Sequence, residues 1–567
     1  MRRLGHGVNG KGYGTGRHVS NTMGMLTQSP SHTSPYRRIM GALGAALVVV
    51  FLVITGLLPL IDSSGWAEEQ AAFSVHSFLV EGNSLLSEKS IQDVLRPFLG
   101  LQKTAADVEK ARDALEKFYH EKGYPAVLVN IPEQTVEEGT VQLQVIESKI
   151  GNVRVTGNRW HTKAMIMHDL PSIEPGKVLY LPDVRKDLQY LNRGEDMKVS
   201  PVLSPGRETG TTDVEIKVED RLPVHGSLEL NNRNTHDTTE LRLNGMLRYD
   251  NLWQKDHSIA GQFQISPEET SEVRLYSLSY TLPAPWAKEH QIALYGLHSD
   301  SNTTTFGQDL LVTGKGTIVG ARYVIPLTPY DTYVHNLTIG ADYKDFQELT
   351  GFSGDQTKTP IRYAPMSFSY NSSYGDMWGA TRFSGGLNVA FRHLVTDQSE
   401  FLIKRFQARG DYMYVTAGVE RDQKLPAGMS LFLKVDGQIA DQPLISNEQY
   451  SAGGMQSVRG YKEAEAMGDD AFHGTAELSA PDLAPLMKLD GRLRLTPFAF
   501  FDYAWVKTKQ PLEGQDEIVS LSGVGLGIRG TLLTRLYYET DYALSLRDTD
   551  KTDKYHGAWY FKLGVQF

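Results

Sequence analysis

The sequence predicts small α+β modules followed by an all-β transmembrane barrel of about 16 antiparallel strands, with one long loop folded into the lumen. Three observations predict this fold class: an internal repeat after the N-terminal segment, a long C-terminal region in which apolar and polar residues alternate, and a glycine-rich interruption of that alternation. With 567 residues, the chain is too long for one ordinary soluble core, so several domains or one large barrel are expected.

The composition argues against several functional classes. A net charge of -10 without a basic stripe argues against a nucleic-acid partner. The absence of cysteine excludes disulfide scaffolds, thiol catalysis and cysteine-ligated metals. A mean hydropathy of -0.32 fits a soluble protein. It also fits a membrane barrel, because lipid-facing and lumen-facing residues alternate along its strands.

Residues 1–67 are interpreted as a leader with a signal sequence. The apolar run at residues 39–61 follows two arginines and precedes small residues at the -3 and -1 positions of a cleavage site after Ala67. The run is also long enough to span a bilayer, so a retained anchor is the alternative. Cleavage is favoured because a polar, folded-looking segment follows directly. Met23 and Met25 are alternative starts within this leader.

An internal repeat follows the leader. The segment Val-Glu-Gly-Asn at residues 80–83 recurs as Val-Thr-Gly-Asn at residues 155–158, and two further segments recur in the same order at an offset of about 75 residues. Each copy reads as an alternating strand ending at a Gly-Asn turn, then amphipathic helices, then closing strands of period two. The repeat predicts two α+β modules, at residues 73–148 and 149–220.

Residues 221–567 are predicted to form the barrel, with no helix expected. Apolar and polar residues alternate in several stretches, for example at residues 383–392, 406–414 and 559–567. A soluble β-sandwich would also alternate. The barrel is favoured by strands near ten residues, by Tyr and Trp near strand ends, and by a chain that terminates on an aromatic residue, Phe567. About 340 residues at roughly 20 per strand and connection predict about 16 strands.

A glycine-rich segment at residues 441–471 interrupts the alternation and contains the tetrapeptide Val458-Arg459-Gly460-Tyr461. The segment is too long for a hairpin turn, and loops of this length are usually functional or disordered. It is therefore the candidate functional loop.

The next strand, at residues 492–505, offers this loop a partner. Its alternation places Asp502 on the lumen side, beside Phe500. An arginine presents a rigid donor fork that pairs with both oxygens of a carboxylate, so a pair between Arg459 and Asp502 could fix the loop in one pose. The alternative is a solvated loop arginine and a solvated lumen carboxylate, whose exposed pairing contributes only about 0–1 kcal/mol.

Four features together resemble one protein family. They are the Val-Arg-Gly-Tyr loop motif, the Phe-Phe-Asp strand motif that ends at Asp502, the tandem Val-x-Gly-Asn turns and the final Phe567. In this order they resemble the two-partner-secretion transporters, of the haemolysin-activator and haemagglutinin-secretion type (TpsB), in the superfamily of the barrel-assembly protein BamA. The resemblance covers residues 73–567. It departs from the family pattern at the start, since cleavage after Ala67 leaves no room for an N-terminal plug helix.

The resemblance implies two periplasmic POTRA modules before a 16-stranded barrel in the bacterial outer membrane, with Arg459 paired to Asp502 inside the pore. It implies that the modules recognise a secreted partner exoprotein of the TpsA type, which the barrel exports without ATP. Outer-membrane lipid and the barrel-assembly machinery are the other implied partners, the latter reading Phe567 as its signal. A monomeric barrel is expected.

No catalytic site, metal site or cofactor is predicted. Histidines and carboxylates are scattered without ligand or triad spacing, and Gly314-Lys315-Gly316 lacks the spacing of a phosphate-binding loop. Strand addition is expected at POTRA edges in residues 140–147 and 196–203. Polar lumen residues are expected to let an extended chain pass, namely Arg382, Arg392, Arg409, Lys434 and Arg494.

Two other functions remain open from the sequence. An insertase of the BamA type shares the loop motif, but the resemblance implies more POTRA modules in such proteins. A diffusion porin or adhesin would not need the duplicated periplasmic modules. An enzyme is the least favoured class.

Overall fold

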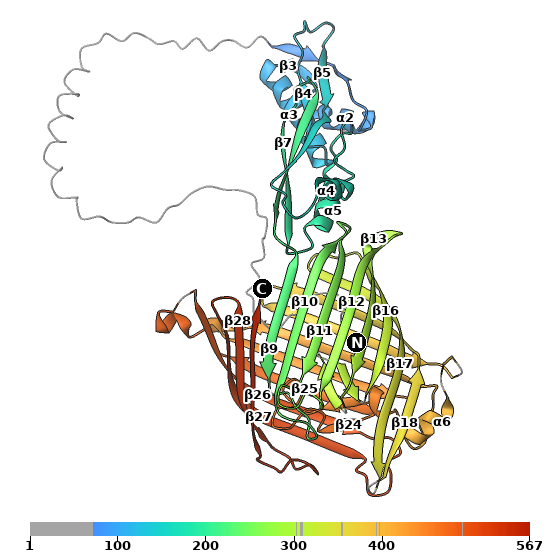
Figure 1. Cartoon of the computed structure of the whole chain (residues 1–567). Coiled ribbons are helices and arrows are strands. Elements are labelled where there is room, and N and C mark those ends of the chain that lie inside the picture. Colours follow the sequence, from blue (N-terminus) through green and yellow to red (C-terminus); the bar gives the residue numbers. More distant parts are fainter. Residues whose placement is uncertain are drawn as a thin grey trace, which may run out of the picture.

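The structure, a computed structural model, describes residues 72–567 apart from 302, 307–309, 314, 353–354, 393, 396 and 490. The predicted leader and its cleavage site after Ala67 lie outside these residues. Two α+β modules extend from one end of a β-barrel (Figure 1). No helix among the described residues is long and apolar enough to cross a membrane.

The first module is a three-stranded sheet covered by helices, with strand order β2-β5-β4. Its elements are β1 (Phe73–Val75), β2 (Ser77–Glu81), α2 (Glu88–Leu95), η1 (Arg96–Phe98), β3 (Gly100–Lys103), α3 (Ala105–Glu121), β4 (Val127–Asn130) and β5 (Thr140–Glu147). Strand β5 lies between a parallel and an antiparallel neighbour. The expectation of a free edge at residues 140–147 is therefore wrong, because β5 pairs on both sides.

The second module repeats this arrangement with the strand order β6-β8-β7. Its elements are β6 (Lys149–Thr156), α4 (Lys163–His168), α5 (Leu181–Leu191), β7 (Met197–Pro205) and β8 (Thr211–Asp220). Strand β7 pairs with β8 alone and is an edge strand. The expected edge at residues 196–203 therefore overlaps a real sheet edge.

The repeated Gly-Asn turns have the same geometry in both modules. Gly82 and Gly157 have positive φ angles of 84° and 86°. A Cβ atom on Gly82 would lie 2.2 Å from the carbonyl oxygen of Val145, and one on Gly157 would lie 2.3 Å from that of Val218. Each turn thus requires glycine for its backbone conformation and for the close approach of the closing strand.

The closed barrel has antiparallel neighbours throughout. Its strands are β9 (Val224–Asn231), β10 (Arg242–Leu252), β11 (His257–Ile265), β12 (Arg274–Ala284), β13 (Ala287–Ser299), β16 (Lys315–Pro326), β17 (Tyr333–Phe352), β18 (Asp355–Tyr363), β19 (Pro365–Asp376), β20 (Gly379–Ala390), β21 (Met413–Lys424), β22 (Ser430–Ala440), β25 (Asp470–Ser479), β26 (Leu493–Lys507), β27 (Ile518–Leu532), β28 (Leu536–Ser545) and β29 (Gly557–Gln566). Strands β18 and β19 pair with successive parts of β17 and occupy one position in the wall. The wall therefore has 16 positions, and the predicted fold class is confirmed.

Three further elements lie in the connections between barrel strands. They are one hairpin, made of β14 (Thr303–Phe306) and β15 (Leu310–Thr313), and two 3-10 helices, η2 (Pro426–Gly428) and η4 (Ala484–Met487).

Along the barrel strands, alternate residues face outward, as on β26, where Phe501 is exposed while Phe500 and Asp502 are buried. This alternation provides an apolar surface toward lipid.

The connection between β20 and β21 contradicts the prediction of a strand at residues 406–414 and of a barrel region without helices. It contains the helix α6 (Gln398–Lys404), and β21 begins only at Met413. Asp397 caps the N-terminus of the helix, because its side chain accepts a hydrogen bond from the backbone N–H of Ser399. Phe401 anchors it against the rings of Tyr363 and Tyr412, with ring centres 5.7 Å and 6.3 Å away.

Charged residues join the second module to the barrel. Asp196 accepts one hydrogen bond from Nε of Arg221 (2.8 Å) and pairs with Nε2 of His225 on β9 (2.7 Å). His225 also lies 3.4 Å from Asp250, which accepts a hydrogen bond from Nε of Arg248. Within the described part of the chain, Asp196, His225 and Asp250 form a group with metal-ligand spacing. Both carboxylates already pair with arginines, so the group forms an ion-paired junction.

Candidate functional site: the loop inside the barrel

The loop at residues 441–469 joins β22 to β25 and folds into the barrel. It contains η3 (Ser446–Glu448), β23 (Tyr450–Ala452) and β24 (Ala466–Gly468). Strands β23 and β24 pair with each other, so the loop is a hairpin with its tip at residues 453–465. Val458, Arg459 and Tyr461 in this tip are buried. The tip therefore packs against the inner wall.

Two glycines let the arms of the tip approach each other. Gly453 and Gly454 have positive φ angles of 108° and 95°. A Cβ atom would lie 2.5 Å from the carbonyl oxygen of Lys462 at the first position and 2.4 Å from Cδ of Glu463 at the second. These positions combine a left-handed backbone with a close contact, and glycine alone satisfies both requirements.

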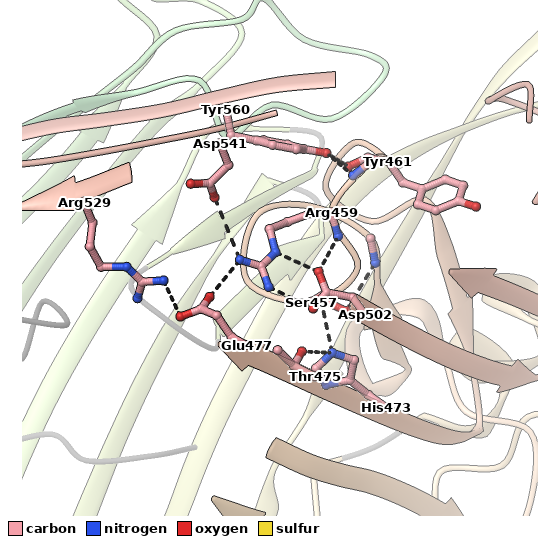
Figure 2. A network of polar contacts seen from close by, with 12 residues as sticks. Ser457, Arg459, Tyr461, His473, Thr475, Glu477, Asp502, Arg529, Asp541 and Tyr560 are labelled. Carbon is pink, nitrogen blue, oxygen red and sulfur yellow. Dashed lines mark hydrogen bonds and ion pairs between the residues drawn. The ribbon is translucent and has the colours of Figure 1, made fainter. Parts of the chain in front are cut away.

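Arg459 binds Asp502 through three hydrogen bonds (Figure 2). Its Nε and Nη2 atoms donate to Oδ2 and Oδ1 over 2.7 Å and 2.9 Å, and its backbone N–H donates to Oδ2 over 3.1 Å. The guanidinium carbon lies 3.3 Å from the ring centre of Phe500, two residues before Asp502 on β26. One strand thus supplies both a bidentate carboxylate and a stacking ring for the loop arginine.

Neighbouring strands add three charged groups that the sequence reasoning missed. Glu477 on β25 accepts a hydrogen bond from Nη1 of Arg459 (3.1 Å) and another from Arg529 on β27. Asp541 on β28 lies 3.9 Å from Nη1 of Arg459. The guanidinium of Arg529 stacks on Phe498, with 3.8 Å to the ring centre. Their positions on the inner face were detectable from strand alternation, but their proximity depends on the register between strands.

The other motif residues hold the tip in place. Gly460 donates its N–H to Oη of Tyr560 (2.9 Å), and this hydroxyl donates to the carbonyl oxygen of Tyr461 (2.7 Å). The hydroxyl of Tyr461 donates to the carbonyl oxygen of Arg547 (2.9 Å). Gly460 has a φ angle of 103°, and a Cβ atom there would lie 2.8 Å from the backbone nitrogen of Ser545. The motif therefore combines a charge, a close backbone contact and a polar ring.

Val458 completes the motif with an apolar anchor. It is fully buried and packs in a cluster with Ala504 and Val506 of β26 and Leu521 of β27. All four positions of the tetrapeptide thus contact the barrel wall.

The near arm of the loop is fixed to another part of the wall. The carboxylate of Glu448 accepts hydrogen bonds from Nζ of Lys344 (2.5 Å), the hydroxyl of Tyr363 (2.7 Å) and the hydroxyl of Tyr414 (2.9 Å). These residues belong to β17, β18 and β21. Because Arg459 is bound to β25 and β26, the loop is anchored to wall strands on both sides of β22.

Asp469 ties the two ends of the loop together. Its carboxylate accepts hydrogen bonds from the N–H of Leu444 (2.8 Å), from Nε2 of Gln449 (3.2 Å) and from the N–H of Lys509 (2.7 Å). Nη2 of Arg405 donates a fourth hydrogen bond over 2.9 Å. This fully buried aspartate therefore fixes the base of the loop.

Phe567, a predicted signal, lies away from this loop. Its backbone pairs with Gly226 through two hydrogen bonds of 3.0 Å, and its side chain is 63% exposed. Five cations were expected in the lumen wall, and for Arg392 and Arg409 this prediction is wrong. Both lie in the connection between β20 and β21, whereas Arg382, Lys434 and Arg494 lie on strands.

Comparisons with known proteins identify the family. The model of the haemolysin secretion/activation proteins ShlB/FhaC/HecB matches residues 210–530, which is more than half of the chain. The chain belongs to this family. A model of the ShlB-type POTRA domain also matches residues 73–148.

Individual relatives share low sequence identity over most of their length. The heme/hemopexin transporter protein HuxB of Haemophilus influenzae is 19% identical over 479 residues, which cover 79% of each chain. The outer membrane transporter CdiB of Dickeya dadantii is 22% identical over 431 residues, or 72% of each chain. These relatives extend the match beyond the segments covered by the family models.

Solved structures show the same fold. CdiB from Escherichia coli aligns with a TM-score of 0.62 and 18% identity over 90% of this chain and 93% of that chain. BamA from Haemophilus ducreyi, lacking POTRA domains 1-3, aligns with a TM-score of 0.54 and 14% identity over 87% of this chain and 100% of that chain. BamA is a relative in fold only.

The family, the barrel and the POTRA region together establish the class of protein. This transporter is an outer-membrane secretion protein of the two-partner type, with POTRA modules in the periplasm. Its family consists of transporters rather than enzymes.

Proposed function

We propose that this transporter exports its partner exoprotein by displacing the tip of the loop at residues 441–469 from the barrel wall. The observation that carries this proposal is the buried, bidentate pair between Arg459 and Asp502. Inside the barrel the loop is attached to the wall both at this pair and at Glu448, and on this proposal the tip moves when an extended chain passes.

The chemistry of the anchor suits a reversible contact. Arg459 and Asp502 are buried and charged, and burying such groups costs several kcal/mol per ion, which their pairing offsets. When the tip leaves the wall, water hydrates the separated charges and recovers part of the lost pairing energy. The pair is therefore specific in the closed barrel without making the closed state irreversible.

The POTRA modules are proposed to hold the partner by strand addition at β2. The first half of β7 is protected from pairing with a partner strand. The side chain of Asn192 bonds both the N–H and the carbonyl oxygen of Val199, and Pro201 lacks an N–H. Strand β4 is protected in the same way by Glu116, which accepts the N–H of Val129.

Strand β2 is a less protected edge. Within the described residues it pairs only with β5, and the outward carbonyl oxygen of its Phe78 accepts a long hydrogen bond of 3.4 Å from Gln92, while no side chain bonds its outward N–H groups. Main-chain hydrogen bonds to such an edge bind an extended segment with limited dependence on its side chains. This property suits a module that receives a long unfolded partner.

Further proposals concern biogenesis. Phe567, exposed at the end of β29, is proposed to be the signal read by the barrel-assembly machinery. The transporter is proposed to work as a monomeric barrel in outer-membrane lipid. We also propose that residues 1–67 are a leader removed after Ala67.

The test of the export proposal compares cells that produce the wild-type transporter, the Arg459→Ala variant or no transporter. Proteins in the culture medium are quantified by mass spectrometry, which also identifies the partner. We expect a protein that depends on the wild-type chain and is lost with the variant, while the variant still assembles into a heat-modifiable barrel. Normal export by an assembled variant would contradict the proposal.

A further inference from the structure

The first and last strands of the barrel meet along the shortest ladder in its wall. Strands β9 and β29 pair between residues 227–231 and residues 562–566, and Gly226 and Phe567 add one further pair beyond the strand ends. By comparison, β26 and β27 pair along the whole of residues 493–507 and 518–532. Backbone hydrogen bonds hold the seam over a short length, so contacts from other elements have a larger share in its stability.

The motif loop bonds to the last strand on one side of this seam. The hydroxyl of Tyr560 on β29 accepts the N–H of Gly460 and donates to the carbonyl oxygen of Tyr461, over 2.9 Å and 2.7 Å. Tyr560 is buried, and Figure 2 shows its ring pointing at the backbone of the motif. One side chain of the last strand thus contacts two backbone groups of the loop tip.

The loop bonds to the segment that follows the first strand on the other side of the seam. Nε of Arg233 donates to Oε1 of Glu463 over 3.0 Å, and both side chains are largely buried. The N–H of Glu463 donates to the carbonyl oxygen of Asn234 over 3.1 Å. Arg233 and Asn234 lie directly after β9, so this contact holds the end of the first strand.

Glu465 spans the two sides by itself. Its Oε2 atom pairs with Nε2 of His236 over 2.6 Å, and its Oε1 atom accepts a hydrogen bond from Thr549. His236 belongs to the connection after β9, and Thr549 belongs to the connection before β29. The carboxylate therefore links the two strands of the seam through their adjoining loops.

We propose that the motif loop is a clamp across the barrel seam, with Tyr560 and Arg233 as its positioning residues. Residues 460–465 contact both sides of the seam within six consecutive positions of the chain. Movement of the tip away from the wall then removes bonds from the last strand and from the segment that follows the first strand. The proposal concerns the closed barrel and does not rely on export, so its test can fail independently of the proposed function.

The test measures hydrogen–deuterium exchange of the purified full-length transporter in detergent. The variants are Tyr560→Phe, which removes one hydroxyl and keeps the ring, Arg233→Gln, and the double variant. We expect amides at residues 227–231 and 562–566 to exchange about fivefold faster or more in the double variant, with smaller increases in each single variant. Heat-modifiability on gels establishes that each barrel is folded.

Tyr538→Phe is the matched control. The hydroxyl of Tyr538 on β28 also bonds a backbone carbonyl, that of Arg494, over 2.8 Å, but it does not contact the motif loop among the described residues. We expect seam exchange in this variant to match the wild type. The proposal is overturned if folded double variants exchange at the wild-type rate in both seam strands, or if only the loop amides at residues 453–465 change.

Discussion

The guanidinium of Arg459 forms two nearly equal hydrogen bonds with the carboxylate of Asp502, with Nε to Oδ2 at 2.7 Å and Nη2 to Oδ1 at 2.9 Å. This geometry needs the planar fork of arginine and both oxygens of the acid, and a lysine cannot reproduce it. The pair joins the tip of a loop to a strand of the wall, so its bonds fix both the position and the orientation of the tip.

Removing the cation should release the tip. The Arg459→Ala variant leaves the buried Asp502 without its partner, at a cost of about 3–5 kcal/mol, which corresponds to more than about a hundredfold shift in a two-state equilibrium. We expect faster proteolysis of the loop and loss of export. Arg459→Lys is the conservative control and should recover export only partly. Wild-type protease resistance in the alanine variant would refute this prediction.

The carboxylates around Arg459 should differ in importance. Asp502→Asn removes a charge that accepts three hydrogen bonds from Arg459, whereas neither oxygen of Asp541 accepts a hydrogen bond within the described part of the chain. We expect Asp541→Asn to retain loop protection and export, and Asp502→Asn to lose both. Equal loss in these isosteric variants, measured by limited proteolysis and secretion, would argue against the bidentate pair as the main anchor.

The glycine pair should be required for packing as well as for backbone conformation. In Gly453→Ala the new methyl group would lie 2.5 Å from the carbonyl oxygen of Lys462. Gly491 also has a positive φ angle, of 76°, but a Cβ atom there meets nothing within 4 Å. We therefore expect Gly453→Ala to lower the resistance of the loop to proteolysis more than Gly491→Ala. Equal losses of protease resistance in the two variants would indicate that the backbone conformation alone accounts for the effect.

The second module should lose stability in acid. Asp220 accepts backbone hydrogen bonds from Arg159, Trp160 and His161 at 2.7–3.0 Å. Burial alone would raise the pKa of Asp220, but these bonds lower it below its usual value. Since the folded pKa is lower than the unfolded one, the stabilisation is present above about pH 4 and is lost as the pH falls through the folded pKa.

The Asp220→Asn variant tests this dependence. It should destabilise the module by about 1.5–3 kcal/mol at neutral pH and weaken the loss of stability in acid. Exchange of amides at residues 149–220, corrected for the intrinsic effect of pH, measures both changes. If the variant loses stability in acid as the wild type does, the acid dependence of the module arises from titratable groups other than Asp220.

Two proline variants should distinguish the POTRA edges. Gln92 bonds the carbonyl oxygen of Phe78, which places Val80 on the outward side of β2, and Leu203 is on the outward side of β7 by its alternation from Val199. Val80→Pro and Leu203→Pro therefore each remove an outward N–H. We expect only Val80→Pro to weaken binding of the partner, measured by co-purification. Weakening by Leu203→Pro alone would place strand addition at β7.

The parts of the fold that follow from strict alternation were predictable from the sequence. The position of Asp502 on the inner face of β26 follows from a period of two, which does not depend on other strands. By contrast, the contact between Glu477 and Arg459 depends on the register of β25 against β26 and on the path of the loop. The pattern of residues within a single strand does not determine that register.

The wrong predictions have two causes. One local pattern fitted more than one structure, and one strand position depended on the pairing order of the sheet. The residues before Met413 alternate like a strand, but the preceding α6 is only seven residues long and is anchored by a single buried residue, Phe401. Alternation in Thr140–Glu147 correctly marks a strand. Its central place in the sheet depends on which strands pair with it, and a single strand pattern does not contain that information.

Asp469 and Glu448 fix the base of the loop. Seven hydrogen bonds converge on these two carboxylates, five of them from residues outside the loop, whereas the contacts beyond β23 and β24 hold only the tip. The tip can therefore move away from the wall while the base of the loop stays in place. On the proposed function, we expect the tip to return to the same place on the wall after each passage, because the base of the loop keeps its position.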